Sequence, residues 1–168
     1  MKKEEMLVAA IRNGIVIDHI PPTKLFKVAT LLQLDDLDKR ITIGNNLRSR
    51  SHGSKGVIKI EDKFQMCSNE EYAPYIKKDK TFEEEELNRI ALIAPNVRLN
   101  IIRDYEVVEK RQVEVPHEIV GLVRCPNPKC ITNNEPMQTR FRVIDAEQCT
   151  LRCDYCERKL AGDRIELL

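Results

Sequence analysis

The chain has 168 residues and a formal net charge of +1, so its overall charge gives no attraction to nucleic acid or to an anionic membrane. Its hydrophobic fraction of 42% is sufficient for a packed core in one domain or in two small ones. No apolar run approaches the length of a membrane span, which argues against a membrane protein.

The first third of the chain has the pattern of a strand, a helix and a hairpin. A β-branched run at 15–20 predicts a strand. After Pro21, a helical face is predicted from apolar residues at i, i+3, i+4 and i+7, which are Leu25, Val28, Ala29 and Leu32. Strands are expected over 40–47 and 57–60, and a polar loop over 48–56 joins them into a hairpin.

A second helix and two further strands follow. Residues 61–80 have no regular pattern and are expected to form an irregular excursion. Thr81 and Glu84 have the spacing of a capping box, which predicts a helix that continues until a proline ends it. A fourth strand is predicted over 97–103, and the run 105–110 is expected to extend the pairing.

The resulting order, β-α-β-β-α-β, is typical of the ferredoxin-like fold, in which one antiparallel sheet carries two helices on a single face. The pattern then becomes all β, with strands expected over 119–124, 140–144, 150–152 and 164–168. We therefore predict an α+β chain with a ferredoxin-like domain at 1–112 and a small all-β domain at 113–168.

Two closely spaced cysteine pairs, with 22 residues between them, dominate the second domain. They are Cys125, Cys130, Cys153 and Cys156. Four thiolates on two such loops suit a tetrahedral Zn²⁺ ion, and because sulfur would fill every position the metal would be structural. Disulfides are the alternative, but nothing in the chain indicates secretion. The thiolates, with Cys67 and Cys149, fit a reducing compartment, so a cytoplasmic location is expected.

A nucleic-acid-binding protein made of a ferredoxin-like sheet and a zinc ribbon is the alternative reading of this architecture. Residues 117–168 hold eight basic and eight acidic residues, and a zinc ion with four thiolates would add a charge of −2. Affinity for phosphates requires an excess of cations, which is absent here. The predicted strands before residue 100 also contain no aromatic residue on which a base could stack.

Few residues have the pattern of a reactive site. The chain has no nucleophile–base signature, glycine-rich phosphate loop or HExxH motif, so no catalytic residue is predicted. Asp18 and His19 interrupt an apolar strand and form either a satisfied structural pair or part of a ligand site. Lys55 and Lys59 are either solvated or gathered with His19 on the open face of the sheet, where they would suit a polyphosphate.

Several segments resemble the regulatory chain of aspartate carbamoyltransferase, and the likeness extends over nearly the whole chain in the right order. They are GIVIDHIP at 14–21, RITIGNNL at 40–47, DYEVV at 104–108, CPNPKCITNNEP at 125–136 and CDYCE at 153–157. The resemblance implies an allosteric domain that binds CTP as inhibitor and ATP as activator. It also implies a zinc domain that docks onto the catalytic chain, which makes carbamoyl aspartate in pyrimidine biosynthesis. Regulatory chains in this family pair as homodimers and link catalytic trimers.

The resemblance also implies roles for individual residues of a nucleotide site. It puts three residues beside the base: Val8, Ala10 and Ile11. Asp18 would lie at the ribose, with Lys59 and Tyr105 around the sugar and base. The residues near the phosphates would be His19, Lys55 and Lys110. It further implies that the pocket is lined by Asn100, Ile102 and Val107. The zinc ligands are the four cysteines, and Asn127 matches a position that contacts the catalytic chain. Ala9, Lys129 and the long excursion over 64–80 depart from the family pattern.

Overall fold

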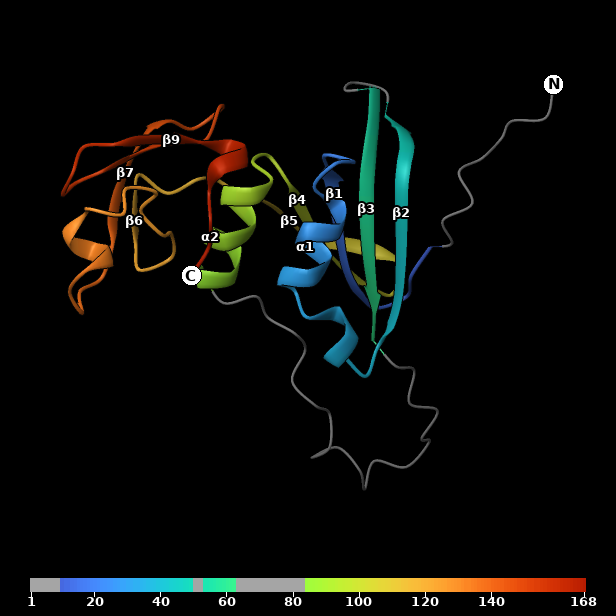
Figure 1. Ribbon diagram of the computed structural model, residues 1–168. Helices are drawn as coiled ribbons and strands as arrows, with labels where there is room; N and C mark the ends of the chain where they lie inside the picture. The colour runs from blue at the N-terminus through green and yellow to red at the C-terminus, as the bar shows by residue number, and fades with distance from the viewer. Residues whose placement is uncertain (1–9, 50–52, 63–83) are drawn as a thin grey trace. The chain divides into compact units, whose positions relative to one another are not determined.

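The computed structural model describes residues 10–49, 53–62 and 84–168, and the description that follows concerns these ranges. They divide into two compact units. The first contains β1 (Gly14–Ile20), α1 (Leu25–Leu31), β2 (Arg40–Ser49), β3 (Gly53–Glu61), β4 (Arg98–Arg103) and β5 (Glu106–Gln112) (Figure 1). The second contains α2 (Glu84–Ile93), β6 (Glu118–Val120), β7 (Arg140–Asp145), β8 (Thr150–Cys153) and β9 (Lys159–Ala161).

The first unit is built on a five-stranded antiparallel sheet with the strand order β2-β3-β1-β4-β5. The predicted α+β class and the β-α-β-β-α-β element order are confirmed, and β5 extends the sheet beside β4. The predicted loop over 48–56 is wrong in extent. Pairing of β2 with β3 continues through Leu47–Lys55 to Ser49–Gly53, because a hairpin exposed to solvent needs backbone hydrogen bonds but no apolar side chains.

Alternation along the strands separates an apolar face from a more polar one. Ile15 and Ile17 of β1 and Ile58 and Ile60 of β3 are all buried and lie on the same face, since they are register partners. The helix α1 lies over β3 on this face, and its buried Leu25 approaches to 2.9 Å of the point that a side chain at position 56 would occupy. Gly56 therefore allows the helix to pack closely on the sheet.

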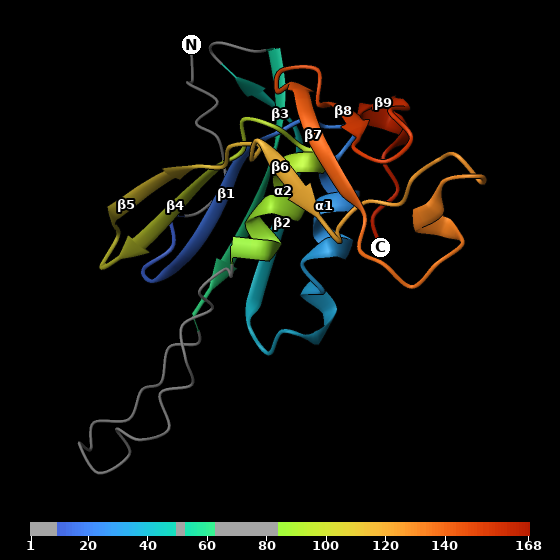
Figure 2. The same ribbon diagram turned by 90° about the vertical axis from the view of Figure 1, so that its left-hand side faces the viewer.

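The second unit contains a four-stranded antiparallel sheet with the order β6-β7-β8-β9, whose strands are labelled in Figure 2. Its buried cluster joins Phe141 and Leu151 of the sheet to Leu92 of α2. The thiol of Cys149 lies 3.4 Å from the Leu92 carbonyl oxygen. These contacts explain why α2 groups with residues 113–168 in the structure.

The strands of the second unit differ in detail from those predicted. Gly121, with φ +69°, ends the first strand early, after Val120. The strand predicted over 164–168 is reduced to a single bridge between Val123 and Leu167, and β9 at Lys159–Ala161 takes the edge of the sheet. In the described part of the chain, no helix is both long and apolar enough to cross a membrane.

Candidate functional site

A row of register partners crosses all five strands on the face opposite α1. Lys59 on β3 lies between Thr42 on β2 and Val16 on β1, and Val16 in turn pairs with Asn100 on β4. Asn100 pairs with Lys110 on β5. Directly opposed residues share a face, so three of the predicted nucleotide-site residues stand in one line.

Two more predicted residues lie next to this row. Ile102 is two residues beyond Asn100 on β4, so its side chain points to the same face. A bulge between Ile101 and Ile102 makes Ile102 pair with Val107. The bulge therefore keeps Val107 beside Ile102 although Lys110 pairs with Asn100, an arrangement that uninterrupted alternation would not give.

Asp18, His19 and Lys55 form a polar cluster at one end of the sheet. Lys55 Nζ lies 2.8 Å from Asp18 Oδ2, and His19 Nδ1 lies 3.2 Å from the same oxygen. The pairing of β1 with β3 is irregular between Ile17 and Ile20, and His19 has φ +63°. This bulge brings His19 to the carboxylate of its neighbour Asp18, which Lys55 of β3 also reaches, so Asp18 is paired and the cluster can also offer donors to a ligand.

Lys59 is the most deeply buried charged residue of the row. Its exposed fraction is 9%, and Val57, two residues earlier on the same face, is also buried. Burial lowers the pKa of Lys59 below its ordinary value, and the charge of Glu61 opposes this only in part. A desolvated ammonium group favours an anionic or strongly polar partner, because such a partner stabilises its charged form.

The opposite end of the sheet carries the residues predicted to lie beside the base. The N–H of Tyr105 donates to the carbonyl of Arg12 at 3.0 Å, which joins the turn between β4 and β5 to the segment that includes Ala10 and Ile11. Tyr105 is 65% exposed, whereas the Ile11 side chain is buried at 3%. Ile11 therefore belongs to the core, its neighbour Ala10 is exposed, and Val8 lies outside the described residues.

The structure thus gathers the predicted residues that it describes on one face and at its two ends. Sequence reasoning missed Val16 and Thr42, which complete the row. The alternation of residues along each strand indicates which of them share a face. Which residues lie side by side across strands can be told only from the register of the neighbouring strands.

The second candidate site is the cluster of four cysteines in the C-terminal unit. The ligand atoms of Cys125, Cys130, Cys153 and Cys156 all lie within 4.8 Å of one another. Cys125 Sγ is 3.5 Å from Cys156 Sγ, and Cys130 Sγ is 3.9 Å from Cys153 Sγ. A tetrahedron with metal–sulfur bonds of about 2.3 Å has edges of roughly 3.8 Å, so these sulfurs fit a single tetrahedral ion.

Hydrogen bonds around the cluster fix the first knuckle. Thr132 Oγ1 donates to Cys130 Sγ at 3.2 Å. The Asn133 amide donates to the carbonyls of Cys125 and Asn127, each at 2.8 Å. Such outer contacts orient the ligands and support their charge, and sequence reasoning identified none of them.

The thiols themselves differ in their ease of ionisation. Burial raises the pKa of Cys125 and of Cys153. For Cys156 burial also acts upward, but hydrogen bonds from the Arg158 backbone and the Asn127 side chain outweigh it, and its pKa is lowered to about 7. A metal ion has to displace the remaining protons, so binding to this cluster weakens in acid.

Asn127 is itself part of the knuckle. Its Oδ1 accepts the Lys129 N–H at 3.1 Å, and its backbone carbonyl accepts the Cys130 N–H at 2.9 Å. The side chain is partly exposed. Its predicted contact with another chain stays a prediction, and its role within the turn is a separate finding.

Comparison with known proteins gives matches over almost the whole chain. A family model described as the aspartate carbamoyltransferase regulatory chain, allosteric domain, matches residues 6–74 and 74–114. The corresponding metal binding domain matches residues 117–166. The aspartate carbamoyltransferase regulatory chain of Porphyromonas gingivalis is 90% identical over 100% of both chains. The regulatory chain of Parabacteroides distasonis is 58% identical over 98% of this chain and 96% of that one. The regulatory chain of Pyrococcus abyssi is 44% identical over 96% of each chain.

Proposed function

Since the chain belongs to the family of aspartate carbamoyltransferase regulatory chains, we propose that it binds nucleoside triphosphates, CTP as an inhibitor and ATP as an activator. It is a regulatory chain and not a catalytic one. The observation that carries the proposal is the row of Lys59, Asn100 and Lys110 across the open sheet face, with the Lys55 cluster at one end.

The polar groups are suited to the successive parts of a nucleotide. Lys55, His19 and Lys110 provide positive or hydrogen-bonding groups for the phosphates. Asp18 can accept hydrogen bonds from ribose hydroxyls while it remains paired with Lys55 at 2.8 Å. Lys59 lies midway along β3, where its ammonium group can donate to a sugar or base oxygen.

The base would lie near the other end of the sheet. There the backbone beside Ala10 and Ile11 would offer donors and acceptors, and the exposed Tyr105 would offer the surface of its ring. Ile102 and Val107 complete this lining. The regulatory effect follows if CTP and ATP bind two quaternary states with different affinities, because each then shifts the equilibrium toward the state it prefers.

We further propose that the cysteine cluster holds one structural Zn²⁺. Four thiolates and tetrahedral spacing favour zinc over harder ions, and they leave no coordination position for a substrate. Bound zinc would join the two knuckles and stabilise the surface through which the C-terminal domain, 113–168, docks onto the catalytic chain, with Asn127 on that surface. The N-terminal allosteric domain, 1–112, would pair with a second regulatory chain. A cytoplasmic location suits the thiolates.

Reconstitution tests the proposed function. The full chain is mixed with catalytic trimers of aspartate carbamoyltransferase, and the rate of carbamoyl aspartate formation is measured with and without CTP and ATP. We expect a larger assembly whose activity CTP lowers and ATP raises. Absence of assembly, or an assembly insensitive to both nucleotides, would contradict the proposal. Salt-dependent RNA binding by a chain that ignores nucleotides would favour the nucleic-acid alternative.

A further inference from the structure

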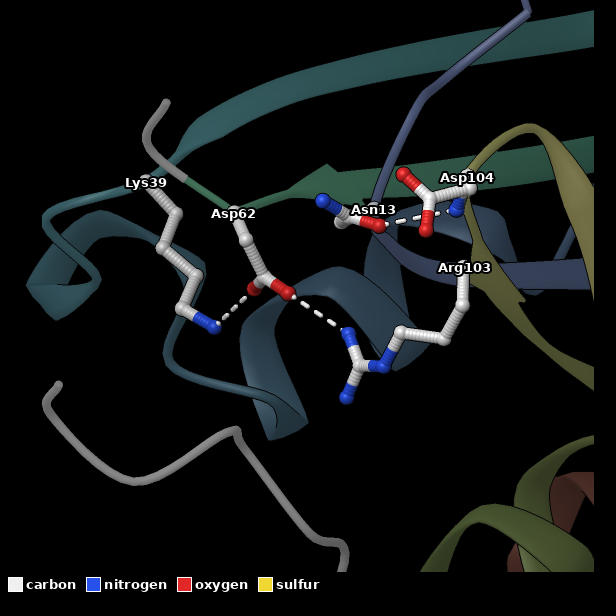
Figure 3. A network of polar contacts seen from close by, with 5 residues as sticks. All are labelled: Asn13, Lys39, Asp62, Arg103 and Asp104. Atoms are coloured by element: carbon white, nitrogen blue, oxygen red, sulfur yellow. Dashed lines mark hydrogen bonds and ion pairs between the residues drawn. The ribbon is translucent and has the colours of Figure 1, made fainter. Parts of the chain in front are cut away.

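At one end of the five-stranded sheet, the Asp62 carboxylate connects residues that lie at the ends of three strands, β2, β3 and β4. Asp62 Oδ1 lies 2.6 Å from Lys39 Nζ, just before β2, and Asp62 Oδ2 lies 3.0 Å from a terminal nitrogen of Arg103, at the end of β4 (Figure 3). Asp62 itself directly follows β3. The Asp62 and Lys39 side chains are 24% and 20% exposed, so solvent screens this contact only in part.

The backbone beside Asp62 continues the connection to the start of β1. The Asp62 N–H donates to the Asn13 carbonyl at 3.0 Å, and Asn13 Oδ1 accepts the Asp104 N–H at 2.9 Å. Arg12 Nε lies 3.2 Å from Asp104 Oδ1, and the Arg12 carbonyl accepts the Tyr105 N–H. The segment before β1 is therefore held between Asp62 and the turn that joins β4 to β5.

This turn needs external support. Asp104 and Tyr105 have φ values of +47° and +67°, which are those of a two-residue hairpin turn that Asn-Gly and Asp-Gly pairs prefer. Asp104 suits the first position, but Tyr105 stands where glycine is preferred, and such a conformation persists where the surroundings hold it. The contacts of Asn13 and Arg12 to the turn, and of Asp62 to Arg103 beside it, provide that support.

We propose that Asp62 is a positioning residue for the base end of the nucleotide site, an inference that rests on the proposed function. Its carboxylate holds Arg103 beside the turn and its backbone N–H holds Asn13, and together they keep the backbone after Ala10 and the ring of Tyr105 in place. Lys55 lies seven residues away along β3, a distance of about 23 Å, so the phosphate end does not depend on this network. Asp62 thereby sets the affinity for the base and sugar, and the relative affinity for CTP and ATP.

Calorimetric titration of the full chain with CTP, ATP and inorganic triphosphate tests this role. Asp62→Asn keeps the size of the side chain but removes the charge that Lys39 and Arg103 share. We expect CTP and ATP to bind roughly tenfold more weakly, within the range that residues outside a ligand site can produce, and the ratio of their affinities to change. Triphosphate affinity should stay within about twofold of wild type, because Lys55 and His19 lie at the other end and Lys110 lies in the row across the middle of the sheet.

Asp36→Asn is the matched control, since it removes an exposed carboxylate of the same unit and should leave all three affinities unchanged. Equal weakening of nucleotides and triphosphate, or unchanged nucleotide affinity in a folded Asp62→Asn chain, overturns the inference. If that variant does not fold, Lys39→Gln is titrated in its place with the same expected pattern. A wild-type chain that binds neither nucleotides nor triphosphate overturns the proposed function itself, and with it this inference.

Discussion

Replacing Lys59 with methionine separates ligand binding from folding. Methionine keeps an unbranched side chain of similar length at a site that is 9% exposed, but it removes the buried charge. We expect the free chain to become more stable by roughly 1 kcal/mol, because the cost of desolvating an ammonium group disappears. Nucleotide affinity should fall at least about 30-fold, since removal of one partner from a buried charged contact costs roughly 2 kcal/mol or more.

The pH dependence of stability gives the same substitution a second signature. The pKa of Lys59 is lowered from 10.5 in the folded chain, so between the lowered value and 10.5 the unfolded chain binds more protons. Stability contributed by this residue therefore rises with pH across that window. Lys59→Met removes this gain, and the stability advantage of the variant should shrink as the pH approaches 10.5.

The assays are urea unfolding of the free chain at neutral pH and near 10.5, and nucleotide titration of the reconstituted enzyme. Lys27→Met serves as the control, because Lys27 is an exposed lysine of α1 and its loss should change neither property. A Lys59→Met enzyme that responds normally to CTP and ATP would refute the assigned site. A variant less stable than wild type at neutral pH would refute the account of Lys59 as a desolvated cation.

Three further substitutions test the metal centre and the sheet. Cys153→Ser should lose zinc and unfold the C-terminal unit, so metal analysis should find no bound ion and gel filtration should find free catalytic trimers; an intact assembly would count against a structural metal. Thr132→Val removes the hydroxyl 3.2 Å from Cys130 Sγ and should weaken zinc binding about tenfold in chelator competition, whereas unchanged affinity would deny it a role in holding the thiolate. Gly14→Ala puts a methyl group 2.1 Å from the Ile60 carbonyl oxygen at φ +148°, and should lower the free energy of unfolding by about 3 kcal/mol; a normal urea midpoint would mean that the backbone adjusts.

The strand pattern was predictable because its signal is local. The β-branched run ending at Ile20 and the apolar alternation at Ile58 and Ile60 indicate strands without knowledge of their neighbours. The extent of the β2–β3 hairpin was not predictable in the same way. Its outer pairs, including Arg48 with Ser54, are held by backbone hydrogen bonds. The polar side chains there have no alternating pattern that would indicate a strand.

The two candidate sites differ in the same way, because the metal site has a local signal and the nucleotide site does not. Four cysteines at short spacings predict a metal site because the knuckle is a local structure. The alignment of Lys59 with Asn100 depends on strands that are distant in sequence, and the bulge at His19 depends on how β1 meets β3. Sequence could therefore nominate these residues through resemblance, but register and bulges decide whether their side chains share a face.

Cys153 is both a metal-ligand candidate and the last residue of β8, where it pairs with the buried Phe141 of β7. In an unfolded chain, Cys130 and Cys153 would have to meet by closing a long flexible loop, which carries an entropic cost. Formation of the β7–β8 hairpin brings Cys153 beside Phe141 and so shortens the part of that loop that remains unordered. Pairing of β7 with β8 therefore lowers the loop-closure cost that metal binding has to meet, and metal binding in turn stabilises the hairpin that positions Cys153.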